Sequence, residues 1–340
     1  MNLQELKTVA RALVAPGKGI LAADESFGTI EKRFKSVSIA STEEQRRAYR
    51  EMLFTTPSIG DYISGVIMFD ETIRHKTKDG ARFCDVLTKA GVAPGIKVDT
   101  GAKDLPGYPG EKITEGLDGL RERLAEYRKL GAKFAKWRAV ITIGSGIPTR
   151  FCVDANAHAL ARYAALCQEA DIVPIVEPEV LMDGDHPGER CAEVTETTLE
   201  SVFFHLHAHR VALEGMLLKP NMVIPGKKCA VKWTPKQIAE ATVRCFMHTV
   251  PAAVPGIVFL SGGQTPQEAT ANLSAMNAIR VHPWQLSYSY GRALQDEALK
   301  AWGGAPAQVT QGQEMFAHRG RLVSAARSGK YSAKMELSVA

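Results

Sequence analysis

The sequence lacks the patterns that mark several large classes of protein. No apolar run approaches the roughly 20 residues that a membrane-spanning helix needs. The segment Met1–Lys7 contains no apolar signal-peptide stretch. Cysteine is sparse, with six residues in 340 and no CxxC pair, which is typical of reduced thiols rather than of a disulfide framework. These absences predict a cytoplasmic protein without a membrane segment.

Charge of one sign is also scarce. The formal net charge is +5, and no basic run is dense enough to predict binding to nucleic acid or to a membrane surface. Linkers, low-complexity segments and internal repeats are likewise absent. A slightly positive chain is compatible with an anionic small-molecule substrate. We therefore expect a single domain over residues 1–340, with no nucleic-acid or membrane partner.

Short apolar runs alternate with amphipathic stretches along most of the chain. Near-continuous apolar strands between helices are typical of a parallel sheet covered on its faces. Eight such runs in 340 residues predict a closed (β/α)8 or TIM barrel of the α/β class, with a doubly wound open sheet as the alternative. Residues 308–340 are expected to form a helix followed by a loose polar tail. The eight expected strands are Gly19–Asp24, Ile63–Asp70, Gly95–Asp99, Phe134–Ile141, Ile172–Pro178, Met216–Pro220, Ile257–Ser261 and Trp284–Tyr290.

Three lysines lie inside apolar, strand-like runs. Lys219 occurs in Leu-Leu-Lys-Pro-Asn, Lys136 in Phe-Ala-Lys-Trp-Arg and Lys97 in Pro-Gly-Ile-Lys-Val-Asp. Lysine is almost never fully buried without a partner, and burial lowers its pKa because it disfavours the ammonium form. One such lysine can simply end a strand and point into water. Three of them, with carboxylates on neighbouring strands, predict amine chemistry at a shared and partly dry site.

Polar residues gather at the C-terminal ends of the expected strands. Barrel enzymes build their active sites at this end from residues of several strands. We therefore place the candidate site there. The residues concerned are Asp24, Asp70, Lys97, Lys136, Glu177, Glu179, Lys219, Ser261 and Arg292.

A neutral lysine amine can attack a ketone and form an iminium, which withdraws electrons so that a nearby carbon–carbon bond can break. A free lysine has a pKa of about 10.4, so reactivity near pH 7 needs a lowering of roughly three units, or about 4 kcal/mol. Desolvation and a neighbouring cation, with Lys136 as the candidate beside Lys219, could supply it. Glu177 and Glu179 would share a face of an extended segment, and we expect their like charges to raise one pKa, as an acid–base group requires. Ion pairing with the lysines is a compatible role for both glutamates.

Two segments have the composition of phosphate sites. Residues 259–264 pass from a strand into glycines, whose N–H groups can form an anion-binding nest, and Arg292 can add a bidentate contact. Barrels often bind phosphate after strands seven and eight, where these residues fall. Residues 24–33 offer hydroxyls, a helix N-terminus and cations for a second phosphate. Either segment alone could equally be a turn with a helix cap.

Two other patterns carry less weight. Residues 260–264 have the letters of the signature segment of ABC ATPases, but the GxxxxGK[ST] loop of that class is absent. His205, His207 and His209 alternate, but in a helix only His205 and His209 would share a face. No HExxH motif or cysteine partner completes a zinc set, so we expect helix-surface and packing histidines and no metal.

In combination, the motifs closely resemble class I fructose-bisphosphate aldolase, in a form similar to its bacterial members. The resemblance extends from the first helix to about Tyr331. It implies a metal-independent TIM-barrel lyase, without a cofactor, that forms a homotetramer. It also implies cleavage of fructose 1,6-bisphosphate to dihydroxyacetone phosphate and glyceraldehyde 3-phosphate in glycolysis or gluconeogenesis. The motifs are Ala22–Ser26, Gly95–Asp99, Ala135–Arg138, Val176–Glu179, Leu217–Met222, Ser261–Gln264 and Ser289–Arg292.

The resemblance also implies a role for each candidate residue. Lys219 corresponds to the Schiff-base lysine and Glu177 to the main acid–base carboxylate. Asp24, Lys136 and Glu179 correspond to groups that assist proton transfer. The implied substrate contacts are Ser261, Gly262, Gly263, Gly291 and Arg292 for the phosphate on C1, Ser26, Thr29, Lys32, Arg33 and Lys97 for the other end, and Arg138 and Ser289 in the same motifs.

One departure from the family concerns the C-terminal residues. Members from animals and plants end in a tyrosine that takes part in proton exchange on the enamine, whereas residues 335–340 contain none. We expect a barrel residue or water to protonate the enamine, in preference to Tyr331. The alternatives to this assignment are another Schiff-base barrel, such as a transaldolase or a deoxyribose-phosphate aldolase, and a non-catalytic sugar-phosphate-binding or scaffolding protein. Two separate phosphate sites argue against the first.

Overall fold

Eight parallel strands form a closed barrel in the computed structural model, which describes residues 1–279 and 281–337. Around the barrel the strands follow the order β1, β10, β9, β8, β7, β6, β3, β2. The predicted TIM barrel is therefore confirmed. The barrel strands are β1 (Gly19–Ala23), β2 (Ile63–Met68), β3 (Ala93–Lys97), β6 (Phe134–Ile141), β7 (Val173–Val180), β8 (Leu217–Leu218), β9 (Gly256–Phe259) and β10 (Gln285–Tyr290).

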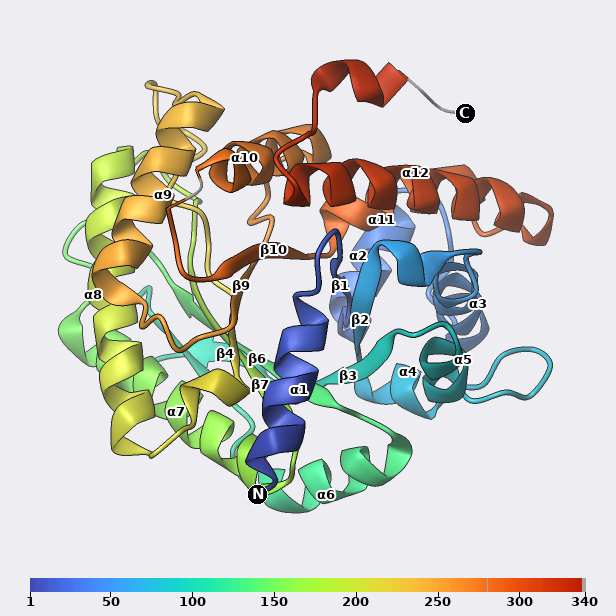
Figure 1. Ribbon diagram of the computed structural model, residues 1–340, viewed down its shortest axis with the longest axis horizontal. Coiled ribbons are helices and arrows are strands. Elements are labelled where there is room, and N and C mark those ends of the chain that lie inside the picture. Colours follow the sequence, from blue (N-terminus) through green and yellow to red (C-terminus); the bar gives the residue numbers. More distant parts are fainter. Residues whose placement is uncertain (280, 338–340) are drawn as a thin grey trace.

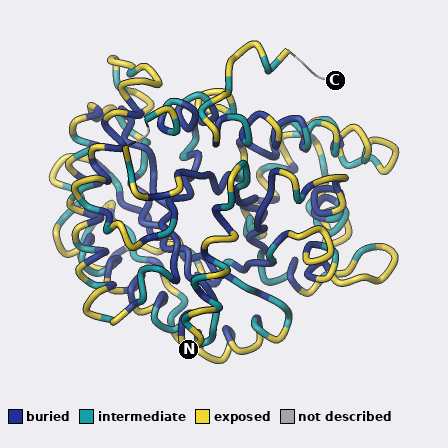
Figure 2. The backbone as a smooth tube through the Cα atoms, viewed as in Figure 1, coloured by how far each residue is buried: buried dark blue, intermediate teal, exposed yellow. Residues whose placement is uncertain are grey.

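Helices surround the barrel and cover the outer face of its strands (Figure 1). Figure 2 shows the same arrangement as a buried centre inside exposed turns. The helices are α1 (Leu3–Leu13), α2 (Phe27–Lys35), α3 (Glu43–Phe54), α4 (Asp70–Arg74), α5 (Phe83–Lys89), α6 (Leu120–Leu130), α7 (Arg150–Glu169), α8 (Gly188–Ala208), α9 (Pro235–Thr249), α10 (Pro266–Ala278), α11 (Arg292–Trp302) and α12 (Val309–Arg327).

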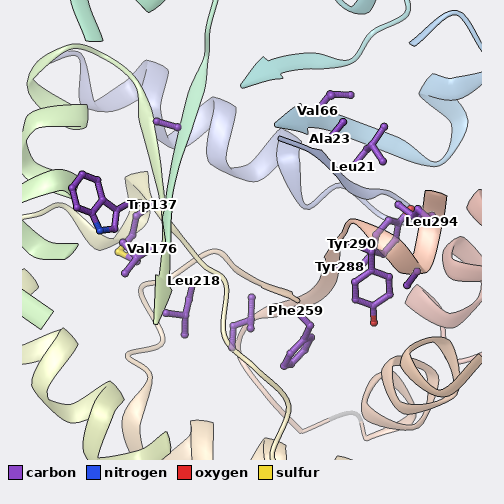
Figure 3. Packing of buried hydrophobic residues seen from close by; sticks show 14 of the residues in the cluster. Leu21, Ala23, Val66, Trp137, Val176, Leu218, Phe259, Tyr288, Tyr290 and Leu294 are labelled. Atoms are coloured by element: carbon purple, nitrogen blue, oxygen red, sulfur yellow. The ribbon is translucent and has the colours of Figure 1, made fainter. Parts of the chain in front are cut away.

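The apolar core has two separate layers because successive side chains of a strand point to opposite faces. The outer layer lies between strands and helices, and Figure 3 shows Trp137, Val176, Leu218 and Phe259 of the consecutive strands β6 to β9 within it. The inner layer fills the barrel near the N-terminal ends of its strands. It contains Ile20, Ile67, Phe134, Val173, Ile175, Leu217 and Val258, packed against Leu6, Ala10, Leu13 and Val14.

Helix α1 and the residue after it close this end of the barrel. Asn2 caps the helix, since its side chain accepts a hydrogen bond of 3.1 Å from the Glu5 N–H. Leu6, Ala10 and Leu13 follow the helical period and are buried against the barrel. Figure 1 shows α1 lying across the middle of the barrel. The site must therefore lie at the opposite end.

The structure contains a hairpin that the sequence pattern does not predict. All eight expected strands are present, but an antiparallel hairpin of β4 (Gly101–Asp104) and β5 (Lys112–Glu115) was not predicted. Its strands are short, mostly polar and largely unburied, so they lack the apolar runs on which the prediction relied.

The expected helix from about residue 308 is α12, but the segment after it is more ordered than the predicted loose tail. Residues 333–337 form a 3₁₀ turn. There Glu336 accepts hydrogen bonds from Arg319, at 2.6 Å, and from the Tyr331 hydroxyl, at 2.7 Å. The Arg319 side chain is fully buried, so this ion pair anchors the turn on α12. Residues 338–340 of the predicted tail lie outside the described residues.

Candidate active site

The inward-facing residues of the barrel change from apolar to charged toward the C-terminal ends of the strands. On β7 the inward series is Val173, Ile175, Glu177 and Glu179, because alternate residues share a face. The same alternation turns other charged side chains into the barrel. They are Asp24 after β1, Lys97 on β3, Lys136 and Arg138 on β6, and Lys219 directly after β8, all of which line one cavity of about 820 Å³.

Lys219, Glu177, Lys136 and Asp24 form a continuous chain of ion pairs in this cavity. Lys219 Nζ lies 3.3 Å from Glu177 Oε1, and Lys136 Nζ lies 3.2 Å from Glu177 Oε2. Lys136 Nζ also lies 2.8 Å from Asp24 Oδ2. The Lys219 and Glu177 side chains are each only 4% exposed, so these charges interact with little screening by water.

The two buried lysines have opposite pKa shifts. Burial lowers the pKa of Lys219, the positive charge of Lys136 lowers it further, and Glu177 only partly opposes both. Burial also acts to lower the pKa of Lys136, but Asp24 and Glu177 together raise it above its usual value. Lys219 is therefore the lysine that gives up its proton more readily, and Lys136 remains an ammonium.

The predicted rise of a glutamate pKa by like charges is wrong for Glu177. Burial acts to raise this pKa, but Lys136, Lys219 and Arg138 outweigh burial and lower it. Asp24 behaves in the same way, since Lys136 and Lys219 lower its pKa despite its burial. The site has cations around each carboxylate, which the local Glu-Pro-Glu pattern could not reveal.

Glu179 has a different partner from Glu177, namely Arg138. Arg138 Nε donates a hydrogen bond to Glu179 Oε2, and the Glu179 carboxylate is buried. The suggested pairing with the lysines is therefore confirmed for Glu177 and wrong for Glu179, whose partner is Arg138.

Lys97 stands at the wall of the cavity beside Asp99. Its Nζ lies 2.7 Å from Asp99 Oδ1 and donates a 2.7 Å hydrogen bond to the Asp99 carbonyl. The Asp99 carboxylate also accepts a hydrogen bond from the Arg138 N–H at 3.3 Å. Asp99 was missed as a site residue, although it stands next to the strand end in the sequence.

The glycine-rich loop after β9 turns through two consecutive residues with positive φ. Gly262 and Gly263 have φ values of +59° and +85°, a region that favours glycine. Gln264 secures the loop, since its side chain donates to the Ser261 carbonyl at 3.0 Å and accepts from Asn272 of α10 at 2.7 Å. Ser289, Gly291 and Arg292 at the end of β10 line the same side of the cavity.

The residues after β1 lie next to this group, because β1 pairs with β10 in the barrel. Ser26 and Thr29 line the cavity, and their hydroxyl oxygens lie 3.2 Å apart. Arg33 also lines it and donates to Glu25 Oε1 at 2.5 Å. Lys32 does not line this cavity and lies instead in an adjoining one of about 450 Å³, together with Thr29, Arg33 and Arg292.

Three further charged groups of the cavity were not selected from the sequence. Arg74 on α4, with Arg123 and Glu126 on α6, line its wall. Arg74 Nη1 donates to Glu126 Oε1 at 2.6 Å, and its Nη2 donates to Asp70 Oδ1 at 2.9 Å. Asp70, a predicted site residue, also lines the cavity, although it begins α4 and does not end a strand. The three unselected groups lie on helices, so a search confined to strand ends could not find them.

No set of three or more His, Cys, Asp or Glu side chains positioned to hold a metal ion occurs in residues 1–279 and 281–337. His205 on α8 and His209 directly after this helix do lie on one side, where both rings approach His158 of α7. All six cysteines are unpaired, and five of them are buried. Within the described segments, no helix has both the length and the apolar character needed to cross a membrane.

A comparison with protein families gives a match over residues 5–340 to the family described as glycolytic, fructose-bisphosphate aldolase class I. The chain belongs to this aldolase family. A probable class 1 fructose-bisphosphate aldolase of Xanthomonas campestris is 57% identical, over 97% of this chain and 99% of that protein. The cytosolic fructose-bisphosphate aldolase 4 of Arabidopsis thaliana is 53% identical, over 98% of this chain and 85% of that protein.

The aldolase fold extends over nearly the whole chain. The solved fructose-bisphosphate aldolase of Plasmodium falciparum, crystallised with TRAP and a small-molecule inhibitor, superimposes with a TM-score of 0.96. It is 48% identical and covers 97% of this chain and 96% of its own. The rejection of an ABC-ATPase interpretation for residues 260–264 is confirmed, because these residues belong to an aldolase barrel loop.

Proposed function

We propose that this aldolase cleaves fructose 1,6-bisphosphate reversibly through an iminium on Lys219. The observation that carries the proposal is the pair of buried lysines with opposite pKa shifts around one carboxylate. Lys219, whose pKa is lowered, can supply a neutral amine, and Glu177 lies 3.3 Å from it as an acceptor for the proton that must leave. Lys97 on β3 and Arg138 on β6 lie across the barrel from Arg292 after β10, which matches a substrate that carries a phosphate at each end.

The first half of the reaction forms the iminium. Lys219 transfers its proton to Glu177, and the neutral amine attacks the C2 carbonyl of the sugar to give a carbinolamine. Glu177 returns the proton to the C2 hydroxyl, which leaves as water while the C=N bond forms. The nitrogen is then positive, and the Glu177 carboxylate is free to act as a base.

The second half breaks the carbon–carbon bond. Glu177 takes the proton of the C4 hydroxyl, the C3–C4 bond breaks, and its electron pair moves through C3 and C2 to the iminium nitrogen. Glyceraldehyde 3-phosphate leaves, and an enamine remains on Lys219. Protonation at C3 and hydrolysis of the iminium release dihydroxyacetone phosphate. The electron withdrawal is supplied by the iminium, so this route needs no metal or cofactor.

Lys136 would stay positively charged, and Asp24 negatively charged, through these steps. Lys136 lies between two carboxylates, and its raised pKa keeps it positive. A fixed ammonium beside Lys219 favours the neutral amine and stabilises the carboxylate form of Glu177. Glu179 would act more indirectly, by holding Arg138 at the cavity wall.

The two substrate phosphates are assigned to two different groups of residues along the cavity wall. Ser261, Gly262, Gly263, Gly291 and Arg292, with Ser289 beside them, would receive the phosphate on C1. Ser26, Thr29, Arg33, Lys97 and Arg138 would receive the other end. Lys32 faces the adjoining cavity, so its proposed contribution is confined to the long-range positive potential.

Enamine protonation is assigned to a barrel residue or water. The Tyr331 hydroxyl donates to Glu336, and its pKa is raised to about 12 by burial and by that carboxylate. Tyr331 lines a second cavity rather than the one that contains Lys219. The donor is therefore sought among the groups close to Lys219.

We further propose that residues 1–340 act as one catalytic domain, with residues 308–340 as its C-terminal helix and tail. Relatives named cytosolic support a cytoplasmic location. A homotetramer is proposed from family membership alone, and sedimentation of the purified protein tests it.

Turnover of fructose 1,6-bisphosphate by the purified chain tests the proposed function. Release of glyceraldehyde 3-phosphate, followed with a coupled dehydrogenase, is expected with wild-type protein and not with Lys219→Met. Absence of turnover in a folded wild-type protein that still binds the sugar bisphosphate would overturn the enzymatic role and leave a binding protein.

A further inference from the structure

A lysine outside the sequence-predicted set lies at the glycine-rich loop. A Cβ added to Gly263 would lie 2.5 Å from Lys227 Nζ and 3.4 Å from Arg292 Nη2, so these two cationic nitrogens are at most about 6 Å apart. A Cβ added to Gly291 would lie 3.6 Å from Arg33 Nη2. The loop and the end of β10 are thus approached by three cations. Lys227 reaches the loop from the second cavity, which it lines together with Gly263.

The backbone around Lys227 is held firmly in place. Its N–H donates to the Met182 carbonyl at 2.8 Å, and the Lys228 N–H donates to the Gly184 carbonyl at 2.8 Å. The Lys227 carbonyl accepts from Lys232 Nζ at 2.7 Å. Gly226 packs so closely on the neighbouring loop that an added Cβ would lie 2.5 Å from the Gly184 carbonyl oxygen. This lysine is therefore anchored at the loop rather than carried on a free segment.

The partner of the Lys227 ammonium is an exposed one. Its Nζ lies 3.2 Å from Asp183 Oδ1, and the two side chains are 41% and 67% exposed. Pairs this exposed are screened by water and contribute little to stability. The ammonium can consequently turn from Asp183 to an anion seated on the Gly262–Gly263 backbone without a large loss.

We propose that Lys227 is a further contact for the phosphate on C1 of the substrate, completing the site formed by the glycine-rich loop and Arg292. The inference rests on the proposed function, which places that phosphate on this loop. Two cations beside the backbone N–H groups of the loop form a stronger site for a dianion than the arginine alone. Lys227 binds substrate and takes no part in proton transfer at Lys219.

The test compares Lys227→Met with Lys228→Met in the full-length protein. Lys228 is an exposed neighbour in the same loop and serves as the matched control. Loss of a half-exposed ionic contact to phosphate should raise KM for fructose 1,6-bisphosphate roughly three- to tenfold, with kcat little changed. Lys228→Met should stay within about twofold of wild type, and Lys227→Arg should restore most of the affinity, since it retains the positive charge.

A second measurement separates phosphate contact from a structural role. Trapping of the covalent adduct with borohydride is measured against the concentration of dihydroxyacetone phosphate and of dihydroxyacetone, which lacks the phosphate. Lys227→Met should weaken the apparent affinity for dihydroxyacetone phosphate and leave that for dihydroxyacetone unchanged. Asp183→Asn should leave both unchanged, because Asp183 only holds the lysine when no phosphate is present.

Three results would overturn the inference. They are equal affinities of Lys227→Met and Lys228→Met, an equal loss with both ketones, and an Asp183→Asn variant as weak as Lys227→Met. All three presuppose an active wild-type enzyme. An inactive wild type contradicts the proposed function instead, so the two failures are distinguishable.

Discussion

The two ends of the barrel interior are built from the same strands, but one is apolar and the other is charged. At the N-terminal end, Val173, Ile175 and Leu217 pack against Leu13 of α1 in an apolar layer. On the same inward face, Glu179 lies four residues after Ile175 on β7, and Lys219 lies two residues after Leu217. Side-chain packing excludes water from the first end, whereas the paired charges of the other end line a cavity of about 820 Å³.

The two ends differ in how much they contribute to the stability of the fold. Apolar burial stabilises the barrel in proportion to the area removed from water. Buried ion pairs do so weakly, because desolvation offsets their attraction. The charged end therefore depends on the apolar end for its rigidity, and its own charges are free to set the protonation of Lys219. Variants at the two ends should separate turnover from stability.

The largest effect on turnover, apart from loss of Lys219 itself, is expected from Glu177→Gln. Cleavage should slow by roughly two to four powers of ten, the usual contribution of a positioned acid–base group. Binding should change much less, because the amide keeps the shape of the side chain and the phosphates anchor the substrate. Single-turnover kinetics and KM check this. Near-normal turnover would move the role to Glu179 or Asp24.

The opposite pattern is expected at the apolar end from Leu13→Ala. The Leu13 side chain is fully buried, and its truncation should lower the free energy of unfolding by about 2–5 kcal/mol. The kcat should stay within about twofold, since no charged group moves. Urea unfolding monitored by circular dichroism measures the change. Thr8→Ala, on the exposed face of the same helix, is the control and should cost under about 0.5 kcal/mol.

A smaller effect links the charged end to acid stability. Lys136 and Lys219 lower the pKa of Asp24 below its unfolded value, so the folded state binds fewer protons. This contribution to stability is present above the ordinary aspartate pKa and is lost as the pH falls from about 5 toward 3 and below. Asp24→Asn should therefore flatten the acid limb of the free energy of unfolding against pH. Asp79→Asn, at an exposed position, should leave that limb as in wild type.

No effect is expected from chelation. The iminium withdraws electrons in place of a metal ion, so treatment with EDTA should leave turnover unchanged. Loss of activity that zinc restores would show that the charged end works by another chemistry.

The sequence was sufficient for the fold and for the charged residues on β3, β6 and β7, and directly after β8, that line the cavity, because both follow one alternation. The apolar runs around Lys136, Glu177 and Lys219 predict strands, and the two-residue period then turns these side chains inward. The hairpin at residues 101–115 was missed because its short strands are mostly polar. The assignment of Lys219 as the reacting lysine came from the family resemblance, since periodicity treats Lys136 and Lys219 alike.

Other features depend on contacts between distant segments. The direction of the Glu177 pKa shift requires the positions of Lys136, Lys219 and Arg138, whereas the Glu-Pro-Glu pattern shows only the second carboxylate. Lys227 follows a loop that carries no strand or helix pattern, and only its approach to Gly263 links it to the glycine-rich loop. The ion pair between Arg319 and Glu336 likewise joins residues whose partnership no local pattern indicates.

The most direct test of the account is the site of covalent trapping. The enzyme is incubated with dihydroxyacetone phosphate and borohydride, digested, and examined by mass spectrometry. We expect one reduced adduct, on Lys219, and none in Lys219→Arg, because a guanidinium stays protonated and cannot form the imine. Circular dichroism should confirm that this variant is folded. An adduct on Lys136 or Lys97 in the wild-type protein would contradict the assignment.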